Sequence, residues 1–430
     1  MLHSQNVNFP KNFLVILVGP WFFYLLILFV FQVKFISFNT IIIAPILLSL
    51  ILSIIFFLFG FRNSASNIKF QNLLRDKERV REISGEPPLI KLIILLALIG
   101  CSLSLYFDVI RALNNETFFS LREQGNPMLY SLRIAKNVEV VEITGSNLQL
   151  ISKVLFPLSF FFYISNFTKK YIFFQWIIII LSLASNLVTG GRFYFLYFLI
   201  IYLFSHSDYK NIKFVKYFNL KNLIIALLIL ILLLWSFSLR IPPNFDLVTY
   251  YKILLGVKSI GLEGRNFGVF NNLKDAFLVL IIYITHSIHV LSLYYDQFSF
   301  DAFSYGGYTF NLIFRIINTI FGTNLAAIQS YVFIDLTFGK YATFAKTLLA
   351  DFGLIGMFIF YSICSYYFGI SYNYKKFYSS FKVIYYWLLT FFLIAPMKGI
   401  ISSGFINLMF CYVIIYAMIE IKMINNSKQV

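Results

Sequence analysis

Apolar runs constrain this chain more than any other feature of its sequence, because runs of about 18 residues or more recur along its whole length. A helix of that length crosses the hydrocarbon core of a membrane, where it satisfies its own backbone hydrogen bonds. Hydrophobic residues make up 60% of the chain and charged residues only 12%, a balance that excludes an ordinary soluble domain. The sequence therefore predicts an all-α, polytopic transmembrane helix bundle.

Ten of these runs are expected to span the membrane. They cover residues 13–31, 41–61, 92–107, 151–167, 171–188, 193–204, 223–239, 343–367, 383–396 and 406–421. Two longer segments lie between them, at 108–150 and at 240–341. The second contains an apolar stretch at 276–295, which we expect to form a re-entrant or interfacial helix. Alternatively, this stretch and a second segment of the same loop both cross the membrane, which gives twelve spans.

The positions of lysine and arginine predict the orientation of the spans. Basic residues are concentrated in the segment 62–91 and in later short gaps, as in the cytoplasmic loops of membrane proteins. Both termini are then cytoplasmic, and the two longer segments are extracytoplasmic. The chain divides into an N-terminal bundle (1–239), a large outer loop (240–341) and C-terminal transmembrane helices (342–430). The net charge of +17 reports this topology, so we expect no nucleic-acid partner.

Arginine and lysine are sorted to different sides of the predicted membrane. Beyond Arg81 every arginine falls on the outer side, whereas the later inner loops carry lysine. These outer arginines are Arg111, Arg122, Arg133, Arg192, Arg240, Arg265 and Arg315. A guanidinium group grips phosphate oxygens in two places, which lysine cannot do. The pattern favours binding of a diphosphate at the outer leaflet, although pairing with nearby acids explains any single arginine equally well.

Three of these arginines have distinctive neighbours. Arg192 follows the sequence TGG at 189–191 in a tight turn at membrane depth, where a charge has a partner or a function unless it snorkels to the interface. Arg240 ends a predicted helix just before two prolines, where it also complements the helix dipole. Arg265 lies among glycines that suggest a bent backbone able to wrap a ligand.

Two further groups of ionisable residues stand out. His286 and His289 are one helical turn apart and could share a face as metal ligands or as a proton acceptor. No third ligand has a recognisable spacing, so we expect no metal, and packed histidines at a helix interface are the favoured interpretation. Asp351 lies in the span after the outer loop and needs a partner there, for which Lys346 is the neighbour. An anchor for the loop is favoured over a proton acceptor.

Several of these features occur together in one family. They are TGGR at 189–192, Arg240 before a large outer loop, Tyr341, Thr343, Asp-Phe-Gly at 351–353, and Gly356. In this layout the chain resembles the Wzy-type O-antigen polymerases over nearly its whole length. The resemblance implies a GT-C-like membrane glycosyltransferase in the inner membrane of a Gram-negative bacterium, with a large periplasmic loop.

Such an enzyme would transfer a growing glycan from undecaprenyl diphosphate to a new lipid-linked repeat unit at the periplasmic face. The resemblance implies a chain-length-determinant co-polymerase as partner, besides membrane lipids, and no cofactor, because the donor is already activated. Arginines would bind the diphosphate and glycan and stabilise the leaving group: Arg192, Arg240, Arg265 and Arg315. His289, Glu263 and Asp351 are the unranked candidates for the base that deprotonates the acceptor.

Three alternatives remain open at this point. An O-antigen ligase would share fold, donor and arginine chemistry and would differ in its acceptor, lipid A-core. A flippase for lipid-linked repeat units would be a transporter, for which we expect short loops, and the large outer loop at 240–341 argues against it. A non-catalytic membrane assembly protein is the third.

Overall fold

Helices make up most of the part of the chain that the structure describes. The computed structural model describes residues 13–35, 38, 40–65, 88–113, 147–159, 172–189, 248–249, 252, 257–261, 271–297, 310, 314, 317–318, 321–323, 344–375, 379–396, 411–415 and 418. Within these residues, three helices are long and apolar enough to cross a membrane, at Thr40–Ala65, Lys91–Ile110 and Ala345–Tyr374. The prediction of a helical membrane protein is confirmed at this level, while the number of spans and the GT-C-like fold stay predictions.

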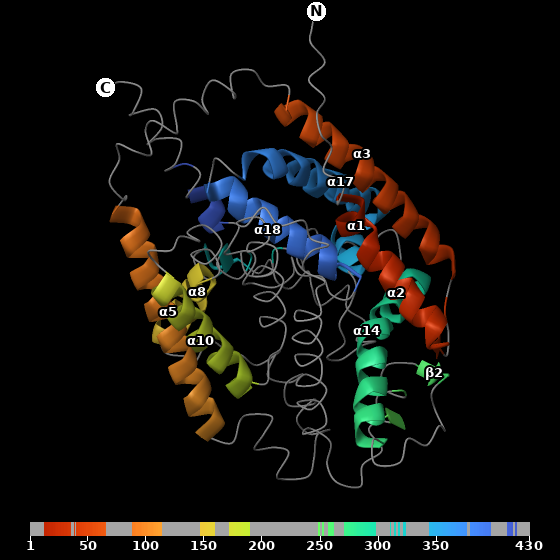
Figure 1. The fold of residues 1–430 in the computed structure, drawn as a ribbon, viewed down its shortest axis with the longest axis horizontal. Helices are drawn as coiled ribbons and strands as arrows, with labels where there is room; N and C mark the ends of the chain where they lie inside the picture. Colours follow the sequence, from red (N-terminus) through yellow and green to blue (C-terminus); the bar gives the residue numbers. More distant parts are fainter. Residues whose placement is uncertain are drawn as a thin grey trace, which may run out of the picture.

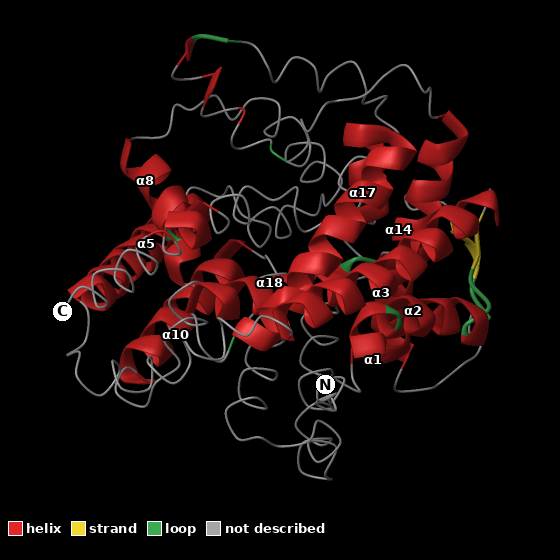
Figure 2. Ribbon diagram, turned by 90° about the horizontal axis from the view of Figure 1, so that it is seen from above, coloured by secondary structure: helices red, strands yellow, loops and turns green. Residues whose placement is uncertain are grey.

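Contacts divide the described elements into two groups, a smaller one on the left of Figures 1 and 2 and a larger one that extends from the centre to the right. One group contains α5 (Pro88–Leu113), α8 (Asn147–Leu155) and α10 (Ile172–Thr189). The other contains α1 (Phe13–Leu17), α2 (Gly19–Val30), α3 (Ile43–Ala65), α14 (Asn271–Gln297), α17 (Phe344–Tyr374) and α18 (Ser379–Ile394). A short 3₁₀ turn, Thr40–Ile42, leads into α3, and two short strands, β1 (Lys34–Phe35) and β2 (Val257–Ser259), lie beside α14.

Most described helices coincide with runs expected to span. The runs at 41–61, 92–107, 171–188, 343–367 and 383–396 correspond to α3, α5, α10, α17 and α18. The runs at 193–204 and 223–239, and large parts of 151–167 and 406–421, lie outside the described residues. Helix α5 continues to Leu113, into the segment that was expected to be an outer loop from residue 108.

The first expected span, 13–31, is divided into α1 and α2 at Val18. Pro20 stands in the first turn of α2, where its missing N–H leaves no donor unsatisfied and its fixed φ suits a helix start. The division is slight, because the N–H of Phe22 still donates to the carbonyl of Val18 at 3.0 Å.

Helix α14 is continuous over 27 residues and covers the apolar stretch at 276–295. Its middle is buried inside the protein, from Thr285 to Ser292 without interruption. Whether it spans the membrane, re-enters or lies at the interface stays a prediction.

Glycines allow α3 and α17 to approach each other closely. A Cβ atom on Gly60 would lie 2.0 Å from the carbonyl oxygen of Tyr366, and one on Gly369 would lie 2.2 Å from that of Phe57. Small residues are the usual means by which membrane helices bring their backbones together. The side chain of Asn373 in α17 adds hydrogen bonds to α3. Helices α3 and α17 are therefore the most closely packed pair in the larger group.

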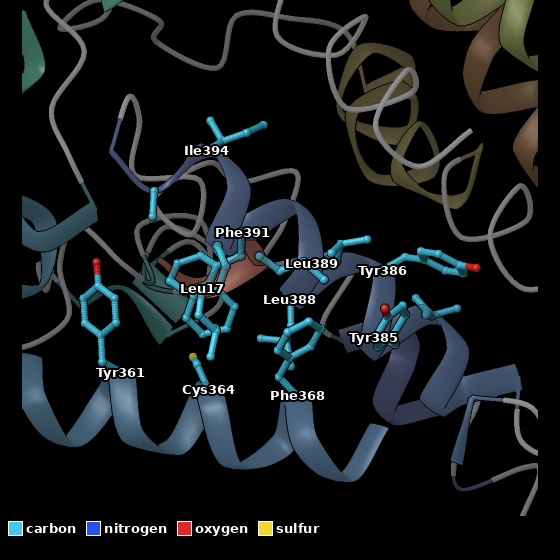
Figure 3. Packing of buried hydrophobic residues seen from close by; sticks show 14 of the residues in the cluster. Leu17, Tyr361, Cys364, Phe368, Tyr385, Tyr386, Leu388, Leu389, Phe391 and Ile394 are labelled. Atoms are coloured by element: carbon cyan, nitrogen blue, oxygen red, sulfur yellow. The ribbon is translucent and has the colours of Figure 1, made fainter. Parts of the chain in front are cut away.

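Aromatic residues fill the core between α17 and α18 (Figure 3). Phe368 stacks on Tyr385 with ring centroids 5.2 Å apart, and Tyr361 lies against Phe391 at 6.2 Å. Leu17 of α1 enters the same core and is fully buried. Helices α1, α17 and α18 are thereby packed as one unit.

The two strands join the chain just after α2 to the large loop. Phe35 pairs with Val257 and Lys34 with Ser259 in an antiparallel arrangement, and the N–H of Gly261 donates to the carbonyl of Phe31 at 2.8 Å. Paired segments must lie on the same side of a membrane. The predicted topology also places them together, on the outer side, although the side itself stays a prediction.

Candidate functional site

Five of the seven residues predicted to form the site lie outside the described residues. They are Arg192, Arg240, Arg265, Arg315 and Glu263. The expectation that Arg192 faces the arginines of the large loop is therefore untested. The other two, His289 and Asp351, are described and lie in α14 and α17, which contact each other.

The first turns of α17 bury two ionisable groups in an apolar helix. Asp351 is fully buried, and Lys346 is 8% exposed. Both lie in the first turns of α17, five residues apart in the sequence. A charge in a membrane interior is costly, so two ionisable groups here mark a candidate site.

Helix α17 is interrupted immediately after this pair. Gly353 has φ 67° and ψ −172°, a conformation that residues with a side chain rarely adopt. A Cβ atom on Gly356 would lie 2.2 Å from the Cβ of Phe352, so the chain is crowded as it resumes its helix. A break within an apolar helix leaves backbone N–H and C=O groups without their helical hydrogen bonds. Membrane proteins tolerate this where other protein groups or a water-filled cavity supply hydrogen bonds.

The two histidines of α14 are buried, with His286 1% and His289 4% exposed. The His289 ring lies parallel to the ring of Phe35, with centroids 5.0 Å apart and planes 1° apart. This agrees with the favoured interpretation of packed histidines at an interface. Among the described residues, no group of three potential ligands could hold a metal ion.

A hydrogen-bond network that sequence reasoning missed surrounds the turn before His289. The Tyr24 hydroxyl donates to the carbonyl of Thr285 at 2.5 Å and accepts the N–H of Ile288 at 3.1 Å. The Ser287 hydroxyl donates to the carbonyl of Pro396, just beyond α18, at 2.6 Å. One turn of α14 is thus tied to both α2 and the end of α18. The only signal in the sequence was a tyrosine within an apolar run.

A second buried carboxylate lies in the other group of helices. Asp108 of α5 is 9% exposed and accepts a hydrogen bond from the hydroxyl of Ser185 in α10. Along the same contact, Ser104 lies 3.0 Å from Ser185, and Cys101 lies 3.2 Å from Ser182. These five residues form what we call the hydroxyl seam. Sequence reasoning placed Asp108 at the start of a loop and missed its burial.

The described part of the site places two proton-accepting side chains, His289 and Asp351, on two helices that contact each other, and α17 also carries the buried Lys346. Such a set can accept a proton and interact with an anion in surroundings that exclude water. Comparison with protein-family models, with curated proteins and with solved structures finds no match to the chain. The function is therefore inferred from the residues themselves.

Proposed function

We propose that the protein is a membrane glycosyltransferase that polymerises undecaprenyl-diphosphate-linked repeat units into O-antigen or a related surface polysaccharide. The observation that carries the proposal is the buried pair of Lys346 and Asp351 at the break in α17. Charges inside an apolar span are costly and mark functional sites. The pair follows directly on the large outer loop, as the layout of the O-antigen polymerases also requires.

The proposed reaction joins two lipid-linked glycans at the periplasmic face of the inner membrane. An acceptor hydroxyl oxygen attacks the anomeric carbon of the donor glycan, and the bond from that carbon to the diphosphate oxygen breaks. Undecaprenyl diphosphate leaves with the bonding electrons, and a base takes the hydroxyl proton. Arg192, Arg240, Arg265 and Arg315 would hold the diphosphate, and a chain-length-determinant co-polymerase would set the product length.

The chemistry of its side chain favours His289 as the base. An imidazole is well suited to proton transfer near neutral pH. Asp351 then keeps the role preferred from the sequence, which is to anchor the end of the large outer loop. Glu263 remains a candidate for the base.

A second function is favoured by one observation. Transporters place interrupted helices and buried charges at their substrate sites, and α17 has both, at Gly353 and at Asp351. A flippase for lipid-linked repeat units is therefore the runner-up. Among the described residues, no contact separates a polymerase from an O-antigen ligase.

Purified full-length protein in liposomes that contain lipid-linked repeat units distinguishes these functions. A ladder of products resolved by length supports the polymerase. Transfer of a single glycan to added lipid A-core supports the ligase. Movement of the repeat unit across the bilayer without a new glycosidic bond supports the flippase and contradicts both transferases.

Arg192→Lys tests the role of arginine in the same assay. Lysine keeps the charge and loses the two-point grip on phosphate, so we expect polymer formation to fall about 10-fold or more. Unchanged activity in this variant would contradict bidentate binding of the diphosphate at this position.

A further inference from the structure

Two residues from the start of the chain, Tyr24 in α2 and Phe35 in β1, hold the segment of α14 that carries His289. Tyr24 contacts the backbone of the turn that precedes this histidine, and Phe35 contacts its ring. We infer that Tyr24 and Phe35 are positioning residues that set the place and the plane of the His289 imidazole for proton transfer. The inference rests on the proposed function, in which His289 is the base.

The hydroxyl of Tyr24 engages the backbone of α14 in two directions. It donates to the carbonyl of Thr285 and accepts the N–H of Ile288. In a regular helix the same carbonyl accepts the N–H of residue 289, and the same N–H donates to residue 284. The hydroxyl therefore contacts backbone groups of the turn from which His289 projects. Tyr24 is 2% exposed, so water does not compete for these bonds.

A second attachment joins the same turn to the end of α18. The Ser287 hydroxyl has one proton, and it donates this proton to the carbonyl of Pro396 at 2.6 Å. Its oxygen also lies 3.2 Å from the Tyr24 hydroxyl. Helix α14 is thus fixed between α2 and the end of α18 at the turn before His289.

The ring of His289 is held separately from its backbone. Phe35 lies parallel to it at 5.0 Å, and the backbone of Phe35 is paired with Val257 in β2. Such support removes rotational freedom from the imidazole before substrate binds. Pre-organisation of this kind is what proton transfer requires, because a displacement of about 1 Å costs up to about 100-fold in rate.

Tyr24→Phe tests the backbone contact, with Tyr412→Phe as a matched control. The Tyr412 hydroxyl donates to the carbonyl of Val154 at 2.6 Å, so the control loses the same type of bond elsewhere. The chain has 4 histidines, and the NMR signals of labelled histidine rings in the full-length protein can be assigned with single His→Gln variants. We expect Tyr24→Phe to shift the His289 signals, and Tyr412→Phe to leave them in place.

Phe35→Leu is the second variant, for the case in which Tyr24→Phe does not fold. It removes the stacked ring and its ring current, so the imidazole protons of His289 should move downfield. In the polymerisation assay both variants should lower kcat about 10- to 100-fold and leave KM within about twofold, while Tyr412→Phe should match the wild type.

The outcomes separate the inference from the proposed function. His289 signals that stay in place in both folded variants would overturn the positioning role, as would full kcat. If the variants shift the His289 signals but the wild-type protein makes no polymer, the contact is upheld and the proposed function is overturned.

Discussion

Asp351 and Asp108 are both buried carboxylates in apolar helices, but their surroundings differ. Asp351 lies five residues after the buried Lys346, and the helix is interrupted two residues later at Gly353. Asp108 accepts a hydrogen bond from Ser185 at the end of the hydroxyl seam. The two helices of that seam, α5 and α10, run without interruption past it.

Under the proposed function, the difference separates a carboxylate at the site from one that only joins helices. Hydroxyl groups hold membrane helices together at a modest gain for each bond, and the hydroxyl seam needs nothing more than that. Two buried ionisable groups beside a helix break add little to stability. Under the proposed function, changes at the start of α17 should therefore reduce activity most.

Asp351→Asn should have the largest effect. It leaves the Lys346 ammonium group buried without its opposite charge, which costs about 3–5 kcal/mol of stability. Polymer formation by the remaining folded protein should fall at least about 100-fold. Thermal unfolding in detergent and the liposome assay measure the two effects.

A double variant sharpens this result. Lys346→Met combined with Asp351→Leu removes both charges and keeps an apolar interior, so stability should return close to that of the wild type. Activity should not return, because the charges and not the packing serve the reaction. Recovery of polymer formation in the double variant would make the pair purely structural.

Gly353→Ala should have the next largest effect. An L side chain at φ 67° is strained by about 1–3 kcal/mol, and relief of that strain would remove the break in α17. Activity should fall about 10-fold. Gly322→Ala is the matched control, since Gly322 has φ 63° with nothing near its Cβ position; equal losses of activity in both variants would refute a special role for the break.

Asp108→Asn should have the smallest effect, although it is the same substitution as at Asp351. The amide oxygen of asparagine can still accept the hydrogen bond from Ser185, so stability should fall by about 1 kcal/mol. Polymer formation per folded molecule should stay within about twofold of the wild type. If Asp108→Asn lowered activity as much as Asp351→Asn does, the proposed difference in role between the two carboxylates would be wrong.

The helices were predictable from the sequence because burial in lipid demands long apolar runs. The runs that became α3, α5, α10, α17 and α18 needed no knowledge of their partners. The pairing of Asp351 with Lys346 stays a prediction, based on the need of a buried carboxylate for a partner.

The rest of the site depends on contacts that no local pattern encodes. Tyr24 and Thr285 are 261 residues apart in the sequence, and the strand that carries Phe35 finds its partner in the large loop. The break at Gly353 was hidden in a Phe-Gly pair that suits an unbroken membrane helix equally well. Asp108 was missed because a carboxylate at the end of an apolar run is equally typical of a loop.

The most direct test of this account is the fraction of lipid-linked repeat units that purified protein in liposomes converts into products of two or more units. Wild type and Asp108→Asn should both give a ladder, and Asp351→Asn should give almost none. Wild-type protein that forms no glycosidic bond, or an Asp351→Asn variant that polymerises as well as Asp108→Asn, would contradict the account.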